Sequence, residues 1–147
     1  HKVDNVSPIA EVEGTPVQHA IIGTCTNGRI EDLEVAARIL DGKKIAHGMT
    51  LTISPASKAV YIEAIHRGYV ETFLRAGATI AIPGCSGCSG GAYVGIPADG
   101  EAVITTANRN FKGRLGNANI FLYLASPATV AASALTGCIE DSRNYVR

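Results

Sequence analysis

The feature that most constrains this chain is a pair of cysteines in a loop with too many glycines to form a helix. Cys85 and Cys88 stand at C-x-x-C spacing in the segment 81–91, Ala-Ile-Pro-Gly-Cys-Ser-Gly-Cys-Ser-Gly-Gly. The loop follows an apolar run, residues 78–82, that is typical of a buried strand. We therefore expect a β-strand that delivers two thiols to the loop at its carboxyl end.

The rest of the chain alternates between apolar runs typical of strands and apolar spacing typical of helices. Strands are predicted for residues 17–23, 49–53, 78–82, 103–107 and 120–125. Helices are predicted to begin at Thr26 or Asn27, at Ser54-Pro55, at Val70 and at Ser126-Pro127. The inner face of the helix that begins at Ser54-Pro55 is predicted to consist of Val60, Ala64 and Ile65. This alternation predicts an α/β fold, a three-layer α/β/α domain with a mainly parallel sheet, over residues 17–147. Residues 1–16 have the composition of an irregular lead-in from an upstream domain.

Several residues with useful chemistry follow expected strands. In parallel sheets, functional residues collect beyond the carboxyl ends of the strands. Cys25, Cys85, Cys88 and the Asn108-Arg109 pair all fall there, so we expect them to form one site. Cys138 follows the last helix and is interpreted as a structural thiol.

Three thiolates at one site leave four interpretations open. They suit an iron–sulfur cluster whose remaining iron is open and acts as a Lewis acid. A zinc site usually has four protein ligands, and a redox dithiol usually stands at the start of a helix. The fourth interpretation is that the thiols are structural.

A second dense stretch, residues 108–116, contains Arg109 and Arg114 just after an expected strand. Guanidinium groups bind carboxylates through two parallel hydrogen bonds, so these arginines suit a small polycarboxylate. The alternative is ordinary solvated surface charge.

Composition excludes several function classes for the 147 residues. The 13 basic residues balance 13 acidic ones, which gives no electrostatic footprint for nucleic acid or an anionic membrane. No apolar run approaches the roughly 20 residues of a membrane helix, and no secretory signal is visible. We therefore expect a cytoplasmic protein whose cysteines serve metal or redox chemistry rather than disulfides.

Taken together, five stretches resemble the aconitase superfamily, in order and over essentially the whole chain. They are Gly23-Thr-Cys-Thr-Asn-Gly-Arg29, Pro83-Gly-Cys-Ser-Gly-Cys88, Ala98-Asp-Gly-Glu101, Thr106-Ala-Asn-Arg-Asn-Phe-Lys-Gly-Arg-Leu-Gly116 and Tyr123-Leu-Ala-Ser-Pro-Ala-Thr129. The Thr-Asn-Gly-Arg form after the first cysteine is similar to the branch of 3-isopropylmalate dehydratase and homoaconitase large subunits. Dimethylmalate-type dehydratases are a further alternative.

The resemblance implies a role for each candidate residue. Cys25, Cys85 and Cys88 match the ligands of a [4Fe-4S] cluster, and Asn27 and Asn108 match asparagines near it. Arg109 and Arg114 match residues that bind substrate carboxylates. The implied reaction is dehydration and rehydration of a hydroxy-di- or tricarboxylate, as between 2- and 3-isopropylmalate in leucine biosynthesis.

The resemblance covers only the third domain of a family large subunit. The implied partners are the remaining domains and a small subunit that carries the mobile domain, so we expect the isolated chain to be inactive. We also expect an exposed cluster to be lost in air. The insert Ser86-Gly87 departs from the Gly-Pro or Met that family members commonly carry, which puts the wall of the substrate pocket in doubt.

Two functions from other classes are disfavoured by the sequence, and one remains open. A cluster-free module that binds RNA is disfavoured by the neutral charge, whereas a metal-binding module remains open. A nucleotide-binding domain is disfavoured because the glycine spacing is loose and lacks an acidic residue about 20 positions on.

Overall fold

The computed structural model describes residues 2–88 and 95–145, and its centre is one five-stranded parallel sheet. The strand order is β3-β2-β1-β4-β5, and every neighbouring pair is parallel. The strands are β1 His19–Ile22, β2 Thr50–Ile53, β3 Thr79–Ile80, β4 Ala102–Thr105 and β5 Phe121–Leu124. This confirms the predicted α/β class with a parallel sheet. The direction of strand succession reverses between β1 and β4, which is where ligands usually bind such sheets.

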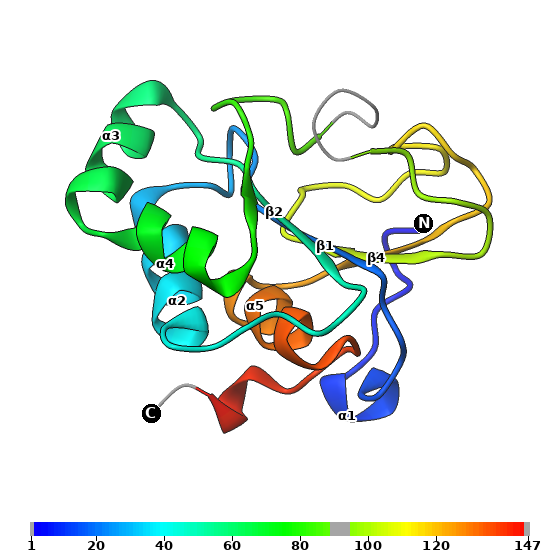
Figure 1. Cartoon of the computed structure of the whole chain (residues 1–147). Helices are drawn as coiled ribbons and strands as arrows, with labels where there is room; N and C mark the ends of the chain where they lie inside the picture. Colours follow the sequence, from blue (N-terminus) through cyan, green and yellow to red (C-terminus); the bar gives the residue numbers. More distant parts are fainter. Residues whose placement is uncertain (1, 89–94, 146–147) are drawn as a thin grey trace.

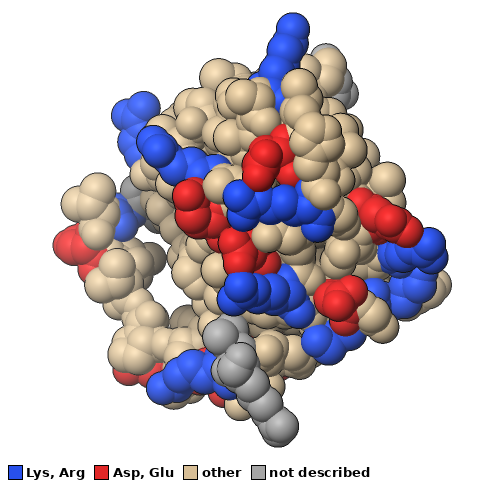
Figure 2. All heavy atoms as spheres, turned by 90° about the vertical axis from the view of Figure 1, so that its left-hand side faces the viewer, with Lys and Arg blue, Asp and Glu red and all other residues tan. Residues whose placement is uncertain are grey.

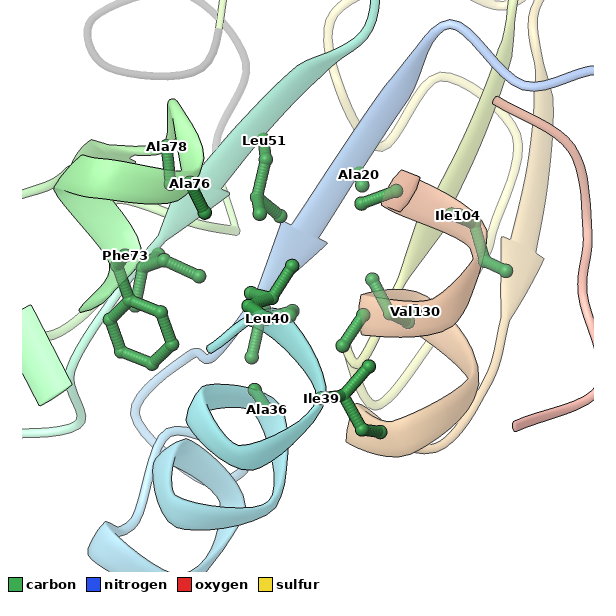
Figure 3. Close-up of a cluster of buried hydrophobic side chains, with 14 of the residues drawn as sticks. Ala20, Ala36, Ile39, Leu40, Leu51, Phe73, Ala76, Ala78, Ile104 and Val130 are labelled. Atoms are coloured by element: carbon green, nitrogen blue, oxygen red, sulfur yellow. The ribbon is translucent and has the colours of Figure 1, made fainter. Parts of the chain in front are cut away.

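The helices pack on one side of this sheet (Figure 1). They are α2 Ile30–Leu40, α3 Lys58–His66, α4 Tyr69–Ala76 and α5 Pro127–Thr136. The main core lies between them and the strands, where Leu40, Phe73 and Val130 are fully buried (Figure 3). Burial of these side chains fixes α2 against α4 and α5, and it thereby fixes the sheet edge from which the cysteine loops emerge.

The opposite face of the sheet is covered by connecting chain in the described residues. Ile21 and Val103 point to this face and are buried beneath Leu115, which comes from the connection between β4 and β5. The stretch with the two candidate arginines therefore lies across the sheet. Its position is set by one apolar anchor, Leu115, rather than by a helix.

Two helices begin later than the sequence suggests. Helix α2 begins after Arg29, not after Thr26 or Asn27, because the Asp32 carboxylate accepts a hydrogen bond from the Arg29 backbone N–H at 3.1 Å. Helix α3 is capped by Ser57, whose hydroxyl accepts from the Val60 N–H at 3.2 Å.

The expected inner face of α3 is also partly wrong. Ala64 is buried and Val60 packs against the core, but Ile65 is 51% exposed. The late start of α3 leaves Ser54 and Pro55 in an irregular connection instead of a helix. That connection proves central to the candidate site.

The predicted lead-in contains one short helix, α1, Ile9–Val12. Directly after it, Thr15 and Gly14 exchange backbone hydrogen bonds of 2.8 Å with Ile139, and Pro16 forms an antiparallel bridge with Cys138. Cys138 thus lies where the tail joins the segment before β1, away from the other three cysteines. The described part of the tail contains a 3₁₀ turn, Ser142–Asn144.

The amino end of the sheet is tied together by side chains. The His19 ring is 2.6 Å from the Thr50 hydroxyl and 2.9 Å from the Glu101 carboxylate. Gln18 accepts from the Ala102 N–H at 2.8 Å. The starts of β1, β2 and β4 are therefore cross-linked at their edge of the sheet.

Charges on the helical side are mixed and locally paired. Figure 2 shows basic and acidic side chains next to one another over the face that carries α2, α3 and α4. Glu34 pairs with Arg38, and Glu71 lies 2.7 Å from Arg75, each one helical turn apart. None of the described helices is long and apolar enough to cross a membrane.

Candidate metal centre

Cys25 is held by a tight turn that follows β1. Gly23 adopts a left-handed conformation, with φ of 94°, and its N–H donates to the Thr106 hydroxyl at 2.8 Å. The buried Thr24 hydroxyl accepts from the backbone N–H groups of Thr26 and Asn27 at 3.3 Å. This local hydroxyl turn replaces the first helical turn and leaves Cys25 exposed.

The second loop presents Cys85 and Cys88 after β3. The Ala81 N–H donates to the Ile53 carbonyl at 2.8 Å, which extends the pairing with β2 past the end of β3. The Cys88 N–H then donates to the Cys85 carbonyl at 2.9 Å and closes a turn. Cys85 is exposed and Cys88 is half-buried.

The two loops touch through their backbones. A Cβ atom built on Gly87 would lie 2.6 Å from the Gly23 carbonyl oxygen, which no real side chain tolerates. Only glycine at this position lets the C-x-x-C loop approach the Cys25 loop so closely. Gly87 thus permits the close approach of two cysteine loops that are far apart in the sequence.

Cys25 and Cys88 lie close enough to Cys85 to affect the ionisation of its thiol. The neighbouring Cys25 and Cys88 thiolates, together with burial and a hydrogen bond to Cys25, raise the pKa of Cys85. Like charges that crowd together disfavour ionisation, whereas a bound cation would reverse this effect. Among the described residues, no group of three His, Cys, Asp or Glu side chains converges on a point where one ion could sit.

The asparagines and arginines are arranged around the end of β4. The Asn27 side-chain amide donates to the Thr106 carbonyl, so it joins the Cys25 loop to β4. Asn108 is exposed and accepts from the Arg114 guanidinium at 3.3 Å. Arg114 also lies over the Phe111 ring, 5.4 Å from its centroid.

The arginine stretch lines a groove of about 1160 Å³ that runs beside β5 and the segment before α1. Arg109 and Arg114 lie in its wall with Lys2 and Lys112, and no acidic residue is found among its described lining. The three cysteines do not line this groove. The structure therefore brings the cysteines together, and it places the arginines in an adjoining region beyond β4.

Sequence reasoning missed the small residues that join the two loops. Ser54 and Ser86 are buried and their hydroxyl oxygens lie 3.0 Å apart. Thr106, also buried, bonds to the Cys25 loop through both its hydroxyl and its carbonyl. The glycines of both cysteine loops were a signal of close backbone approach, but they did not identify the partner segment.

Comparison with known proteins shows clear relatives. Residues 2–137 match the aconitase family (aconitate hydratase). The chain is 55% identical over 146 residues to "3-isopropylmalate dehydratase large subunit 2" of Archaeoglobus fulgidus, covering 99% of this chain and 35% of that protein. It is 57% identical over 143 residues to "Probable methanogen homoaconitase large subunit" of Methanosarcina mazei, covering 97% and 36%.

A bacterial relative has the same kind of name. "3-isopropylmalate dehydratase large subunit 1" of Thermotoga maritima is 47% identical over 148 residues, which covers 99% of this chain and 35% of that protein. The chain thus spans about a third of the length of the curated relatives it matches.

Proposed function

Because this chain belongs to the aconitase family, we propose that it supplies the iron–sulfur ligands of a hydro-lyase that dehydrates and rehydrates a hydroxy acid. The observation that carries the proposal is the proximity of three thiols, Cys25, Cys85 and Cys88, at the carboxyl end of the sheet. The activity belongs to a longer assembly, since the chain corresponds to about a third of its relatives.

The residues present fit a [4Fe-4S] cluster. Sulfurs that ligate a cluster bind separate irons, so they need to be close but need not converge on one point. The glycines of both loops let their backbones pack closely together, and Cys25 and Cys85 stay exposed, where a large inorganic group would reach them. When bound, the cluster would supply one iron without a protein ligand, which acts as a Lewis acid toward a substrate hydroxyl.

Arg114 and Arg109 would bind the carboxylates of the substrate. The Arg114 Nε is buried, and within the described part of the chain it has no hydrogen-bond partner. A buried donor without a partner is costly, and a substrate carboxylate would satisfy it. The excess of basic side chains in the adjoining groove points to the same class of ligand.

The substrate we infer is an isopropylmalate. Relatives named 3-isopropylmalate dehydratase match the chain at 55% and 47% identity. A homoaconitase is the second candidate, because a relative with that name is 57% identical. The substrates of both kinds of enzyme would be hydroxy-di- or tricarboxylates. Asn27 and Asn108 would lie near the cluster in either case.

The assembly would include the rest of a large subunit and a separate small subunit, as the names of the relatives indicate for those proteins. Residues 1–16 would be the junction with an upstream domain, and residues 17–147 the cluster-bearing domain. We propose a cytoplasmic enzyme, and we expect the chain alone to bind a cluster without turning over substrate.

The experiment is anaerobic reconstitution with iron and sulfide, followed by iron and sulfide counts and EPR. About four irons per chain are expected in the wild type, with a large loss in Cys25→Ala. Cys138→Ala is the matched control, because this thiol lies at the Pro16 bridge and should leave the iron content unchanged. Stoichiometric zinc in place of iron, or equal iron in both variants, would contradict the proposal.

A further inference from the structure

The connection between β2 and α3 holds both cysteine loops at once. The Ala56 N–H donates to the Gly28 carbonyl at 2.9 Å, and Gly28 belongs to the Cys25 loop. The Gly84 N–H donates to the Pro55 carbonyl at 2.9 Å, and Gly84 precedes Cys85. A segment that contributes no ligand therefore makes one backbone hydrogen bond to each loop.

Ser54 lies at the centre of this junction and is fully buried. A Cβ atom built on Gly23 would lie 2.0 Å from the Ser54 carbonyl oxygen, and one built on Gly28 would lie 2.4 Å from it. The Cys25 loop is thus wrapped around the Ser54 carbonyl. Ser54 also contacts the C-x-x-C loop, because a Cβ atom built on Gly87 would lie 3.2 Å from the Ser54 Cβ.

The side chain of Ser54 continues the connection. The Ser86 hydroxyl donates to the Ile82 carbonyl, which cannot donate in return. A serine has a single hydroxyl proton, so the Ser86 oxygen must accept from Ser54 across the 3.0 Å between them. The order is therefore Ser54 to Ser86 to Ile82, and Ser86 stands between the two cysteines of the C-x-x-C loop.

We infer that Ser54 and Ser86 are positioning residues, whose paired hydroxyls set the separation of Cys25 from Cys85 and Cys88. The inference rests on the proposed function, because the separation of the thiols matters for how well they retain a cluster. The pair uses the Ser86-Gly87 insert of the C-x-x-C loop. In this chain the serine supplies the hydrogen bond, and the glycine supplies the close contact with Gly23.

The first test needs no cluster. In a chain that carries Cys88→Ala and Cys138→Ala, only Cys25 and Cys85 can react with dibromobimane, which fluoresces after it has bridged two nearby thiols. Ser54→Ala and Ser86→Ala should each slow this bridging by about a factor of ten, the scale of one buried hydrogen bond. The double serine variant should be no slower than Ser86→Ala, because that variant already removes the hydrogen bond between the two hydroxyls.

The control is Ser133→Ala, which removes an equally buried hydroxyl that bonds within α5 to Thr129 and receives the Glu140 N–H. It should leave the bridging rate unchanged even if it lowers stability. If Ser86→Ala fails to fold, Ser54→Ala decides alone, because it keeps the bond from Ser86 to Ile82. Equal rates in all variants, or additive losses in the double variant, would overturn the positioning role.

The second test uses the reconstituted chain with all cysteines present. Iron release to a ferrous chelator under argon should be about ten times faster in Ser54→Ala than in the wild type or Ser133→Ala. Ser86→Thr, which keeps the hydroxyl, should release iron as slowly as the wild type. A wild-type chain that takes up no iron would contradict the proposed cluster, while the bridging rates would still decide the role of the two serines.

Discussion

The two ends of the sheet are built in opposite ways. At the amino end, long polar side chains cross from strand to strand, and His19 contacts both Thr50 and Glu101. At the carboxyl end, glycines and small hydroxyl residues let whole backbone segments touch, as Gly23 does with Ser54. The amino end is held by hydrogen bonds between side chains, whereas the close contacts at the carboxyl end require glycines, which have no Cβ atom.

Because of this difference, substitutions at the two ends of the sheet should have different consequences. A side-chain bridge can be removed with a local loss, because the backbone beneath it remains paired. Backbone segments in direct contact have no such freedom, since one extra methyl group must displace a loop. Substitutions at the carboxyl end should therefore disturb the thiols as well as the fold.

The largest effect is expected for Gly23→Ala. Its φ of 94° is strained for alanine, and the new Cβ would overlap the Ser54 carbonyl oxygen. We expect a loss of about 3 kcal/mol in the free energy of unfolding, from the left-handed strain together with overpacking. Urea denaturation followed by circular dichroism measures this loss.

Gly14→Ala is the matched control, because its φ of 82° is also left-handed but nothing lies within 4 Å of the new Cβ. It should cost only about 1 kcal/mol. The difference between the two variants isolates the close contact at the carboxyl end. Equal losses would mean that the Cys25 loop can move away from Ser54 without penalty, and the comparison between the two ends would fail.

The strands and the meeting of the cysteines could be predicted from the sequence. Apolar runs marked the strands, and the rule that parallel strands end at one edge brought Cys25 and Cys85 together. The prediction needed no side-chain detail, because sheet topology alone places the loops. The proximity that affects the Cys85 thiol is the physical counterpart of that rule.

The junction around Ser54 could not be predicted in the same way. Ser54-Pro55 has the local signature of a helix start, and only the contacts with Gly23 and Gly87, far away in the sequence, show why the helix is delayed. The start of α2 after Arg29 has a similar origin, because the Thr24 hydroxyl accepts hydrogen bonds from the N–H groups of Thr26 and Asn27 in the turn before the helix. In both places a tertiary or side-chain contact outweighs local propensity.

A smaller effect is expected at the amino end from Glu101→Gln. The hydrogen bond from His19, and then the one from the Ala98 N–H, lowers the pKa of Glu101. The pKa of Glu101 in the folded chain therefore lies below the unfolded value of about 4.3. Its contribution to stability is complete above that value and is lost as the pH falls through the folded pKa.

Glu101→Gln should thus cost about 0.5–1 kcal/mol at pH 7, as for a half-exposed pair, and should cost less in acid. Urea titrations at a series of pH values between 7 and 3 test this dependence. In the background of His19→Ala, the same substitution should have a much smaller effect at pH 7, because the pair is already broken. An undiminished effect there would place the contribution of Glu101 outside this contact.

The smallest effect is expected for Gln18→Ala, which removes the acceptor of the Ala102 N–H while the Gln18 N–H still donates to the Ala102 carbonyl. The loss should be about 0.5 kcal/mol, because this hydrogen bond is only partly buried and water can partly replace the amide. Gln18→Glu keeps an acceptor oxygen and should lose less. Neither variant should change the rate at which Cys25 and Cys85 are bridged, since both lie at the far end of the strands. A change in that rate would mean that the two ends of the sheet are mechanically coupled. The geometry of the carboxyl end would then depend on the whole sheet rather than on the backbone contacts around Ser54.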